Sequence, residues 1–329
     1  MNYKSFLYIG FIIILIISGC VSKDTQENGR ANAEQTNVTI GYSALRISLP
    51  VFVAYENGYF EEEGLNVKLE RYETAQPLME SLVAGEVDIA GYTALPITFN
   101  CMLKSNKELY FVTAMMEDQD HPVSYFLVPV NADEDVELAD FKGKKIGILP
   151  TVAYKVWLEI ILKENGVDPD DVQIVPIAPL IEQDALRTGE IDALFTNDPA
   201  ATKAIKDGIA RKISNEALVP KYLGEPFIFG SFNIDKTFAD NNPEIIEKVV
   251  TALEKAVQFV NEEPVLAKQA MEQFFYGQPK TYVEFYPNAY YKRSTEVTGE
   301  DFQKLADMYF ELGIIPAKLA VEELSYKAK

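Results

Sequence analysis

The residues best suited to hold a small molecule stand in loops that follow predicted strands. These loops offer hydroxyl groups, amides, aromatic rings, a guanidinium and a carboxylate, the usual chemistry of a small-molecule pocket. In open α/β sheets, ligands bind beyond the carboxyl ends of the strands, where helix N-termini present unpaired N–H groups. The expected ligand-binding residues are Ser43, Leu45, Arg46, Thr74, Gln76, Tyr92, Thr93, Thr151, Val152, Ala153, Tyr154, Asn197 and Asp198.

Arg46 and Asp198 would favour ligands of opposite charge. A guanidinium in the cleft would pair with a sulfonate, nitrate or carboxylate group. A carboxylate in the cleft would repel an anion and accept an amine or a ring N–H. Each residue also has a structural explanation, because Arg46 suits a solvated surface and Asp198 suits a helix cap before Pro199. The sequence therefore leaves the charge of the ligand open.

Four other candidates have structural alternatives of the same kind. Thr93 and Thr151 are equally suited to cap helices, and a capping hydroxyl can also contact a ligand. The rings of Tyr92 and Tyr154 are suited either to stack on a ligand or to line the rim of the cleft. Both roles stay open for each residue.

The sequence carries no recognisable set of catalytic or metal-binding residues. Its one histidine, His121, cannot form a metal site alone. It has no Ser/His/Asp arrangement, no glycine-rich phosphate loop and no paired cysteine site. Cys101 follows an apolar run and is expected to be a small buried side chain. We therefore expect no enzyme activity, no metal and no cofactor.

The composition excludes one class of partner. The chain has 329 residues, and 30 Lys and Arg against 50 Asp and Glu give a formal net charge of −20. So acidic a protein lacks the basic surface that neutralises nucleic-acid phosphates, and it does not dock electrostatically on anionic lipid. The length suits roughly two domains. We expect a monomer that binds no nucleic acid.

The N-terminus has the pattern of a secretory signal. One positive charge at Lys4 precedes a short apolar run that ends near Ile17, and this run is shorter than a membrane span requires. The next residues, Ser18-Gly19-Cys20, complete a segment that resembles the lipobox of bacterial and archaeal lipoproteins. The resemblance implies a signal peptide over residues 1–19, a lipid on Cys20 and a polar tether over residues 20–36. The protein would then be anchored on the extracytoplasmic face of a cell membrane.

A repeated pattern predicts two lobes. Ser81–Ala90 and Ala185–Leu194 each combine the end of a helix, a glycine suited to the left-handed position just past it and a short apolar strand. The flanking elements occur in the same order. In the first half, strands are expected over residues 38–42, 65–71 and 87–90, with helices over 49–57 and 77–84. In the second half, strands are expected over 145–149, 172–177 and 191–195, with helices over 152–165 and 181–188. Two βαβαβ units predict two α/β lobes with mainly parallel sheets.

The C-terminal third is expected to return to the first lobe. Asn242-Pro243-Glu244 begins a long helix, and helices are also expected over 265–275, 298–312 and 318–324. The apolar stripe of the long helix comprises Ile246, Val249, Val250, Leu253, Ala256, Val257 and Val260. The chain would cross between the lobes near residues 127–129 and 229–231. Lobe I would then comprise residues 37–128 and 230–329, lobe II would comprise 129–229, and the two crossings would form a hinge.

Several short segments of the sequence together resemble a known family. They are residues 55–60, 63–67, 85–88, 140–147, 189–193 and 242–244. In this order they resemble the nitrate/sulfonate/taurine/thiamine-precursor group of ABC-importer binding proteins, which have a type II periplasmic-binding-protein fold. The resemblance runs from about Asn37 to the C-terminus.

The resemblance implies capture of a small molecule in the cleft and its delivery to an ABC permease with its ATPase. A sulfonate, a nitrate-like ion or another small organic anion is favoured, and a thiamine-precursor-like pyrimidine or other neutral heterocycle is the alternative. Two other functions remain open: a pyrimidine-synthase-like enzyme, which in that family uses histidine and iron, and a surface sensor or scaffold.

Overall fold

The computed structural model describes residues 36–274 and 280–326, and these residues belong to one compact unit. The predicted signal peptide, Cys20 and all but the last residue of the predicted tether lie outside the described residues. Among the described residues, no helix combines the length and apolar character needed to cross a membrane.

Six strands form the first sheet, in the order β11-β4-β10-β3-β1-β2. Strands β1 (Thr36–Ser43), β2 (Leu65–Tyr72) and β3 (Ile89–Ala94) are parallel. Strand β10 (Phe227–Asp235) is antiparallel to β3 and to β4 (Leu109–Glu117), and β11 (Tyr290–Lys292) is antiparallel to β4. This sheet and its helices are called lobe I.

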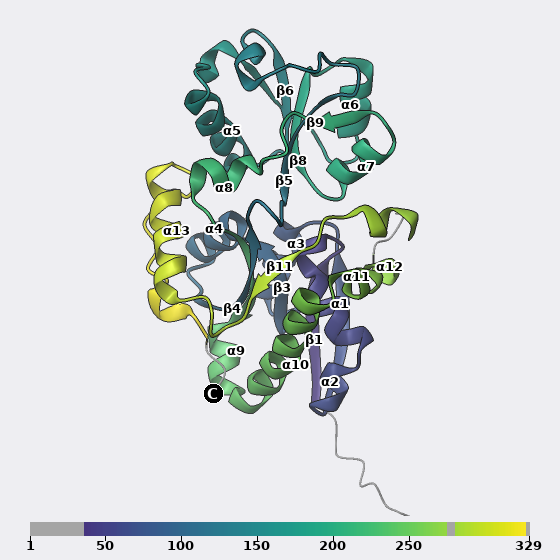
Figure 1. Cartoon of the computed structure of the whole chain (residues 1–329). Coiled ribbons are helices and arrows are strands. Elements are labelled where there is room, and N and C mark those ends of the chain that lie inside the picture. The colour runs from purple at the N-terminus through teal and green to yellow at the C-terminus, as the bar shows by residue number, and fades with distance from the viewer. Residues whose placement is uncertain (1–35, 275–279, 327–329) are drawn as a thin grey trace, which may run out of the picture. The chain divides into compact units, whose positions relative to one another are not determined.

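Five strands form the second sheet, in the order β7-β6-β8-β5-β9. Strand β6 (Lys145–Ile148) is parallel to both β7 (Gln173–Pro176) and β8 (Ala193–Asn197). Strand β5 (Ser124–Pro129) is antiparallel to β8 and to β9 (Ala210–Lys212). This sheet and its helices are called lobe II, drawn in teal in Figure 1.

Helices cover both sheets (Figure 1). In lobe I the α-helices are α1 (Leu49–Glu56), α2 (Tyr59–Glu62), α3 (Ala75–Ala84), α4 (Leu95–Ser105), α9 (Lys236–Asn241), α10 (Pro243–Glu262), α11 (Pro264–Gln269), α12 (Met271–Phe274) and α13 (Gly299–Glu311). In lobe II they are α5 (Val152–Glu164), α6 (Glu182–Thr188) and α7 (Ala200–Lys206), and α8 (Leu218–Leu223) leads back to lobe I. Short 3-10 helices are η1 (Arg46–Ser48), η2 (Leu138–Phe141), η3 (Pro169–Asp171), η4 (Lys280–Phe285) and η5 (Glu322–Leu324).

The repeated Gly-Glu-x-Asp sequence holds the first strand of each βαβαβ unit to the third, β1 to β3 in lobe I and β6 to β8 in lobe II. Asp88 accepts a hydrogen bond from the Thr39 N–H at 2.7 Å, and its own N–H donates to the Thr39 carbonyl at 3.0 Å. Asp192 makes the same two bonds with Lys145, at 2.8 Å each. Gly85 and Gly189 both have φ of +75°, which allows each preceding helix to end directly before this clamp. The two predicted βαβαβ units are therefore confirmed.

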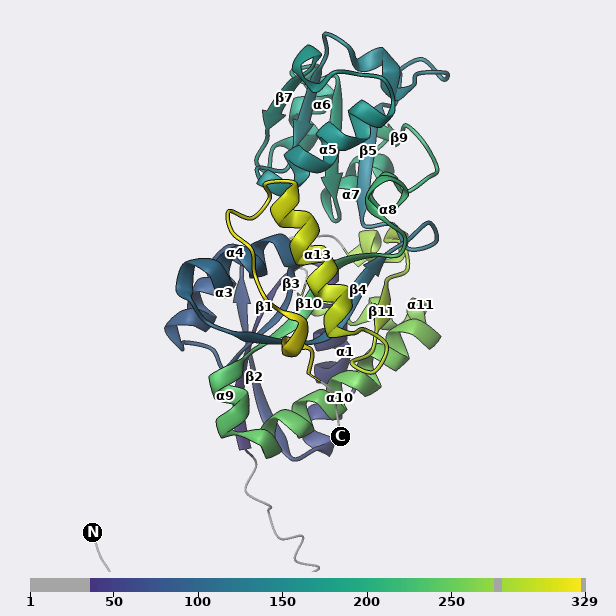
Figure 2. The same ribbon diagram turned by 90° about the vertical axis from the view of Figure 1, so that its left-hand side faces the viewer.

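The C-terminal third returns to lobe I as predicted. Helix α10 packs against α1 and α2, and every residue of its predicted apolar stripe is buried. Helix α13 packs over β4 and α4 (Figure 2). In this contact Phe302 stacks on Phe111 of β4, and the Tyr309 ring lies against Phe99 of α4. Burial of each such large side chain contributes about 1.5–3 kcal/mol.

Two predictions about the sheets are wrong. Both sheets are mixed, not mainly parallel, because the strands that flank the crossings between the lobes, β4, β5, β9 and β10, pair antiparallel with their neighbours. The first crossing lies over residues 118–123, not at 127–129, since Leu127 is paired within β5 to both Leu194 and Lys212. The second crossing lies over residues 213–226, and Gly230 is inside β10. An apolar run in a central strand resembles a buried connection in sequence, which explains both misplacements.

Two helix predictions also need correction. The helix expected over residues 318–324 is only the 3-10 turn η5. The helix expected over 265–275 is divided into α11 and α12.

Candidate ligand-binding site between the two lobes

Arg46 is the central cation of the site. It begins η1, three residues after the end of β1, and its side chain is 3% exposed. Its Nη2 donates to the Pro122 carbonyl at 2.6 Å, and its Nη1 donates to the carbonyls of Pro287 and Asn288 at 3.1 and 3.3 Å. Burial lowers the pKa of the guanidinium, but Asp198 and other nearby acidic groups more than offset this, and the net shift of the pKa is upward. Arg46 is therefore a permanently charged group.

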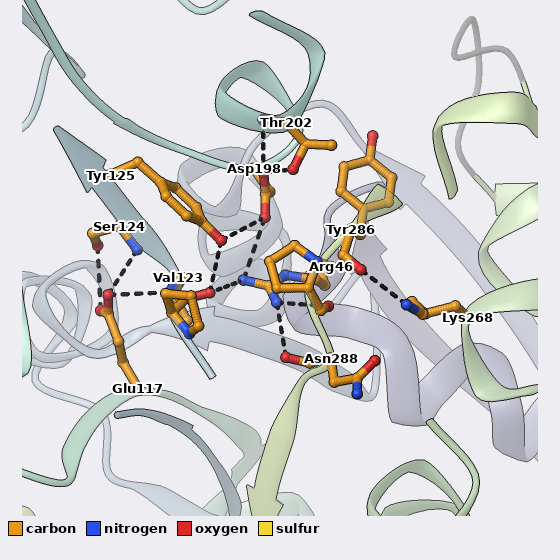
Figure 3. A network of polar contacts seen from close by, with 12 residues as sticks. Arg46, Glu117, Val123, Ser124, Tyr125, Asp198, Thr202, Lys268, Tyr286 and Asn288 are labelled. Atoms are coloured by element: carbon orange, nitrogen blue, oxygen red, sulfur yellow. Dashed lines mark hydrogen bonds and ion pairs between the residues drawn. The ribbon is translucent and has the colours of Figure 1, made fainter. Parts of the chain in front are cut away.

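Asp198 faces Arg46 from lobe II. It follows β8, and its Oδ2 lies 3.4 Å from Nη2 of Arg46 (Figure 3). Its Oδ1 accepts hydrogen bonds from the Thr202 N–H at 3.1 Å and the Thr202 hydroxyl at 2.6 Å. The Tyr125 hydroxyl donates to Oδ2 at 3.4 Å and to the Pro122 carbonyl at 3.0 Å. The carboxylate is thus both a helix cap and the lobe II partner of Arg46.

Glu117 fixes the first crossing segment. It ends β4, is fully buried, and its Oε1 accepts hydrogen bonds from the N–H groups of Val123 at 3.0 Å and Ser124 at 2.7 Å (Figure 3). Burial raises the pKa of Glu117 to about 7, although these hydrogen bonds act in the opposite direction. The Ser124 hydroxyl lies 3.2 Å from the Tyr154 hydroxyl. One carboxyl group therefore links β4 of lobe I to β5 of lobe II.

The two crossing segments are also bonded to each other. Gln119 accepts from the Ala217 N–H at 2.8 Å and donates to the Ala217 carbonyl at 3.1 Å. The cavity beside these segments, lined in part by Tyr125 and Leu218, holds only about 10 Å³. That is space for at most one water molecule, so this region is closely packed.

Residues after the long helix reach both lobes. Lys268 on α11 is buried and donates to the Tyr286 carbonyl at 2.9 Å (Figure 3). Burial, and secondarily the charge of Arg46, lowers the pKa of Lys268. In η4, the Tyr282 hydroxyl donates to Asp207 of lobe II at 2.6 Å. The Lys206 ammonium lies 3.8 Å from the centre of the Phe285 ring. The segment 280–288 thus connects α7 of lobe II to Arg46 of lobe I.

Several buried polar atoms have no hydrogen-bond partner among the described residues. Three belong to one loop of lobe I: the Ser43 hydroxyl, the Nε of Arg46 and the Ser48 hydroxyl. In lobe II, Oε1 of Glu182 also has no hydrogen-bond partner among the described residues. The other carboxyl oxygen, Oε2, accepts a hydrogen bond from the Thr196 hydroxyl at 2.8 Å. Burial raises the pKa of Glu182 to about 7. Buried polar groups are normally hydrogen-bonded, so these atoms mark places where a polar ligand or water would fit.

Most of the sequence matches a known family. Residues 31–273 match the NMT1-like family. The chain belongs to the NMT1-like family. Among the relatives of this NMT1-like protein is the 4-amino-5-hydroxymethyl-2-methylpyrimidine phosphate synthase THI13 of Saccharomyces cerevisiae, 24% identical over 82% of this chain and 80% of the relative. The taurine-binding periplasmic protein of Escherichia coli is 24% identical over 65% of this chain and 63% of the relative.

Solved structures share the fold of the NMT1-like protein. The periplasmic aliphatic sulphonate binding protein SsuA from Escherichia coli matches with a TM-score of 0.71 at 18% identity, over 88% of this chain and 97% of that chain. The predicted fold class, a type II periplasmic-binding-protein-like fold of two α/β lobes, is confirmed by this likeness and by the two sheets.

The structure brings some predicted site residues of the NMT1-like protein together and leaves others apart. Arg46, Asp198 and Tyr154 belong to the inter-lobe network, and Ser43 contributes a buried, unpartnered hydroxyl. Thr151 caps α5, where its hydroxyl accepts from the Tyr154 N–H at 3.2 Å, as its structural alternative predicted. The other residues at this edge are Leu45, Ala153 and Asn197, which are buried or half-buried, and Val152, which is 56% exposed.

Tyr92 and Thr93 are not loop residues, because β3 extends to Ala94. The Tyr92 ring packs against Phe232 and Tyr291 in the core, and its hydroxyl is bonded to Thr113. The Thr93 hydroxyl is bonded to Thr98 and to Asn233. Both side chains are therefore packed and hydrogen-bonded within the core of lobe I.

Thr74 and Gln76 lie at an exposed corner. Thr74 stands at the N-terminus of α3 without a capping hydrogen bond from its side chain. Gln76 donates to Glu80 one turn later at 2.8 Å, an ordinary pair on a helix surface.

Sequence reasoning missed Glu117, Ser124, Tyr125 and Lys268. The first three are strand residues beside the true first crossing, and a correct placement of that crossing would have pointed to them. Lys268 lies in an amphipathic helix where a lysine normally faces water, so no local signal distinguished it. His121, the one histidine, contacts Asp118 at 2.8 Å. Among the residues that the structure describes, no three His, Cys, Asp or Glu side chains are grouped to hold a metal ion.

Proposed function

We propose that this NMT1-like protein is the extracytoplasmic solute-binding component of an ABC importer and captures a small molecule between its lobes. The observation that carries the proposal is the meeting of Arg46 from lobe I with Asp198 from lobe II, with side chains only 3% and 2% exposed. The two side chains follow the carboxyl ends of strands in the two repeats, and this is the edge at which open α/β sheets bind ligands. Relatives named as taurine-binding and sulphonate-binding proteins support this role.

The favoured ligand is a sulfonate, a nitrate-like ion or another small organic anion. Its anionic group would contact Arg46, whose Nε and the neighbouring hydroxyls of Ser43 and Ser48 supply unused buried donors. A neutral heterocycle such as a thiamine-precursor-like pyrimidine is the alternative, and it would use the hydroxyls without pairing with the guanidinium.

The mechanism is a shift between open and closed arrangements of the lobes. A ligand that contacts both lobes favours the closed form in proportion to its greater affinity for that form. The crossing segments at 118–123 and 213–226 would act as the hinge. The closed form would dock on a permease served by a separate ATPase, and the binding protein would act as a monomer without cofactor.

A thermal-shift screen of sulfonates, oxyanions, pyrimidines and amines tests the proposal. A ligand at about 100 times its Kd stabilises the folded state by about 2.7 kcal/mol, which raises the Tm. Small-angle scattering with the same ligand should show compaction. The Arg46→Gln variant should lose the response to an anion, whereas Arg187→Gln, which removes an exposed charge of lobe II, should retain it. Absence of compaction with every ligand that binds would exclude the hinge mechanism.

We further propose that Cys20 carries the lipid anchor. Expression with labelled palmitate should label the wild-type protein in the membrane fraction, and Cys20→Ser should release an unlabelled protein. A labelled Cys20→Ser variant would show that the lipid is attached elsewhere.

A second function, pyrimidine synthesis, is favoured by the names of relatives such as THI13. Incubation of the purified protein with candidate pyrimidine precursors and iron, followed by mass spectrometry, distinguishes the two. Repeated turnover would show that the protein is an enzyme and would overturn the importer role. Binding without turnover would support the importer role.

A further inference from the structure

The first strand of lobe I contains an Asn-x-Thr sequence. Asn37-Val38-Thr39 is the one place in the 329-residue chain where an asparagine is followed two residues later by a serine or threonine. Asn-x-Ser and Asn-x-Thr, with x other than proline, are the acceptor sequences for N-linked glycans at the surface of secreted proteins. So short a sequence also occurs by chance, so the surroundings of Asn37 decide whether a glycan fits there.

The Asn37 side chain is exposed on a sheet face that is covered only further along β1. Its neighbours Val38 and Ile40 are buried on the opposite face, since successive side chains of a strand point to opposite sides. Gly41 lies on the same face as Asn37, and there α3 covers the sheet so closely that Leu78 would clash with any Cβ at Gly41. This cover ends before Asn37, so a bulky group on its side chain would extend into solvent.

The amide nitrogen of Asn37 is available for modification. Its oxygen Oδ1 accepts a hydrogen bond from Nδ2 of Asn66 on β2 at 2.7 Å, and among the described residues Nδ2 of Asn37 donates to none. Asn66 and Lys68 are exposed as well, and β2 is the outer strand of the sheet. On its other side, β1 pairs with β3 only at Ile40 and Gly41. Glycosylation substitutes the nitrogen and leaves the oxygen as an acceptor, so the bond from Asn66 persists in a glycosylated protein.

We propose that Asn37 is an N-glycosylation site that is modified on the extracytoplasmic side of the membrane. The sugar donor is an oligosaccharide carried on a lipid phosphate. Nδ2 of Asn37 forms a bond to the anomeric carbon of the first sugar, and the bond from that carbon to the phosphate oxygen breaks. The lipid phosphate leaves with the electron pair, the amide loses one proton, and nothing is oxidised or reduced. The inference rests on the extracytoplasmic location in the proposed function, and it concerns a site outside the cleft.

A glycan on Asn37 would leave the cleft between the lobes open. Strand β1 begins at the end of lobe I that lies away from lobe II (Figure 1) and ends at Ser43. Six residues of extended strand separate Asn37 from Ser43, a distance of about 20 Å. The glycan would instead stand beside the start of the domain, where the tether predicted over residues 20–36 ends. We therefore expect the glycosylated protein and Asn37→Gln to bind the same solute with Kd values within about twofold of each other.

Mass spectrometry of the full chain, isolated from its native cells, tests the inference. Trypsin cleaves after Arg30 and Arg46, so residues 31–46 form one peptide that contains Asn37. We expect this peptide to carry the added mass of an oligosaccharide, with sugar fragment ions and the attachment localised to Asn37. Protease treatment of intact cells or spheroplasts identifies the exported protein. An unmodified peptide from protein that the protease reaches would overturn the inference.

Substitutions assign the acceptor. Asn37→Gln and Thr39→Ala should each lose the glycan completely, because the first replaces the acceptor asparagine and the second removes the hydroxyl that the acceptor sequence requires. Thr39→Ser keeps a hydroxyl and should keep the glycan. The matched control Asn66→Gln changes an exposed amide outside the acceptor sequence and should also keep it. A glycan retained in Thr39→Ala would overturn the assignment, and if a variant fails to fold, the wild-type peptide still decides.

The outcomes for this site and for the importer role are separable. An unmodified exported protein that binds a solute and compacts would leave the importer role standing while this inference fell. A glycosylated protein that binds no solute would support this inference while the importer role fell.

Discussion

The Arg46 guanidinium and the Asp198 carboxylate lie 3.4 Å apart, although β1 and β8, the strands that precede them, belong to different sheets. Both side chains are almost fully buried, and each is also held by contacts on its own side of the cleft. The pair therefore joins the lobes at the point where the proposed ligand binds, and its energetics should be measurable without any ligand.

A double-mutant cycle should show strong coupling between these two residues. Arg46→Met or Asp198→Leu alone should lower the free energy of unfolding by about 3–5 kcal/mol, because each leaves a buried charge without its partner. The double variant should lose clearly less than the sum. Urea denaturation monitored by tryptophan fluorescence measures each value. The exposed pair Arg187–Asp184, with side chains 58% and 69% exposed, is the control and should contribute less than about 1 kcal/mol.

Glu117 should make stability depend on pH between about 4.5 and 7. Its pKa is raised by burial to about 7 in the folded protein, so ionisation is harder there than in the unfolded chain. Stability is therefore highest below the unfolded pKa and falls as the pH rises to about 7, by up to about 3 kcal/mol. Glu117→Gln keeps an acceptor for Val123 and Ser124 and should flatten this part of the curve.

The control for Glu117 is Glu300→Gln, since that side chain is 68% exposed. Glu182→Gln should flatten the same pH range, because burial also raises the pKa of Glu182 to about 7. Denaturation midpoints at several pH values provide the comparison. Parallel curves for wild type and Glu117→Gln would contradict the buried ionisation.

Tyr282→Phe should loosen the segment that joins α7 to Arg46. The lost hydrogen bond to Asp207 costs about 1 kcal/mol or less at this partly exposed site. Hydrogen–deuterium exchange should increase over residues 281–286 and stay unchanged in β10. Lys203 first, and Tyr282 second, lower the pKa of Asp207 to about 2, so these contacts support the fold above pH 3.8 and are lost as the pH falls toward 2. Unchanged exchange in Tyr282→Phe would show that the segment is held by other contacts.

Gly230→Ala should disturb the loop that carries Arg46. A Cβ at this position would lie 2.5 Å from the Thr93 carbonyl oxygen and 2.6 Å from Cδ1 of Ile47, the residue after Arg46. We expect a loss of about 1–3 kcal/mol in stability, measured by thermal or urea denaturation. Adding Ile47→Val removes the side-chain clash but leaves the carbonyl clash, so the rescue should be only partial. Full stability in Gly230→Ala alone would mean that β10 and β3 can separate at no cost.

The sequence by itself determined the two βαβαβ units and the long C-terminal helix. These features are local: a glycine ends a helix, an aspartate clamps the strand beside it, and apolar residues recur with the period of a helix. It also named Arg46 and Asp198 as site candidates, since loops after parallel strands converge at one edge of a sheet.

Only the tertiary structure decided which of these candidates meet. The pairing of Arg46 with Asp198 depends on the order of strands in two sheets and on where the chain crosses between them, and the sequence misplaced both crossings. The same holds for Lys268 and η4, whose contacts join residues far apart in the chain. Local spacing carries no information on such contacts, because they form only when separate elements pack against one another.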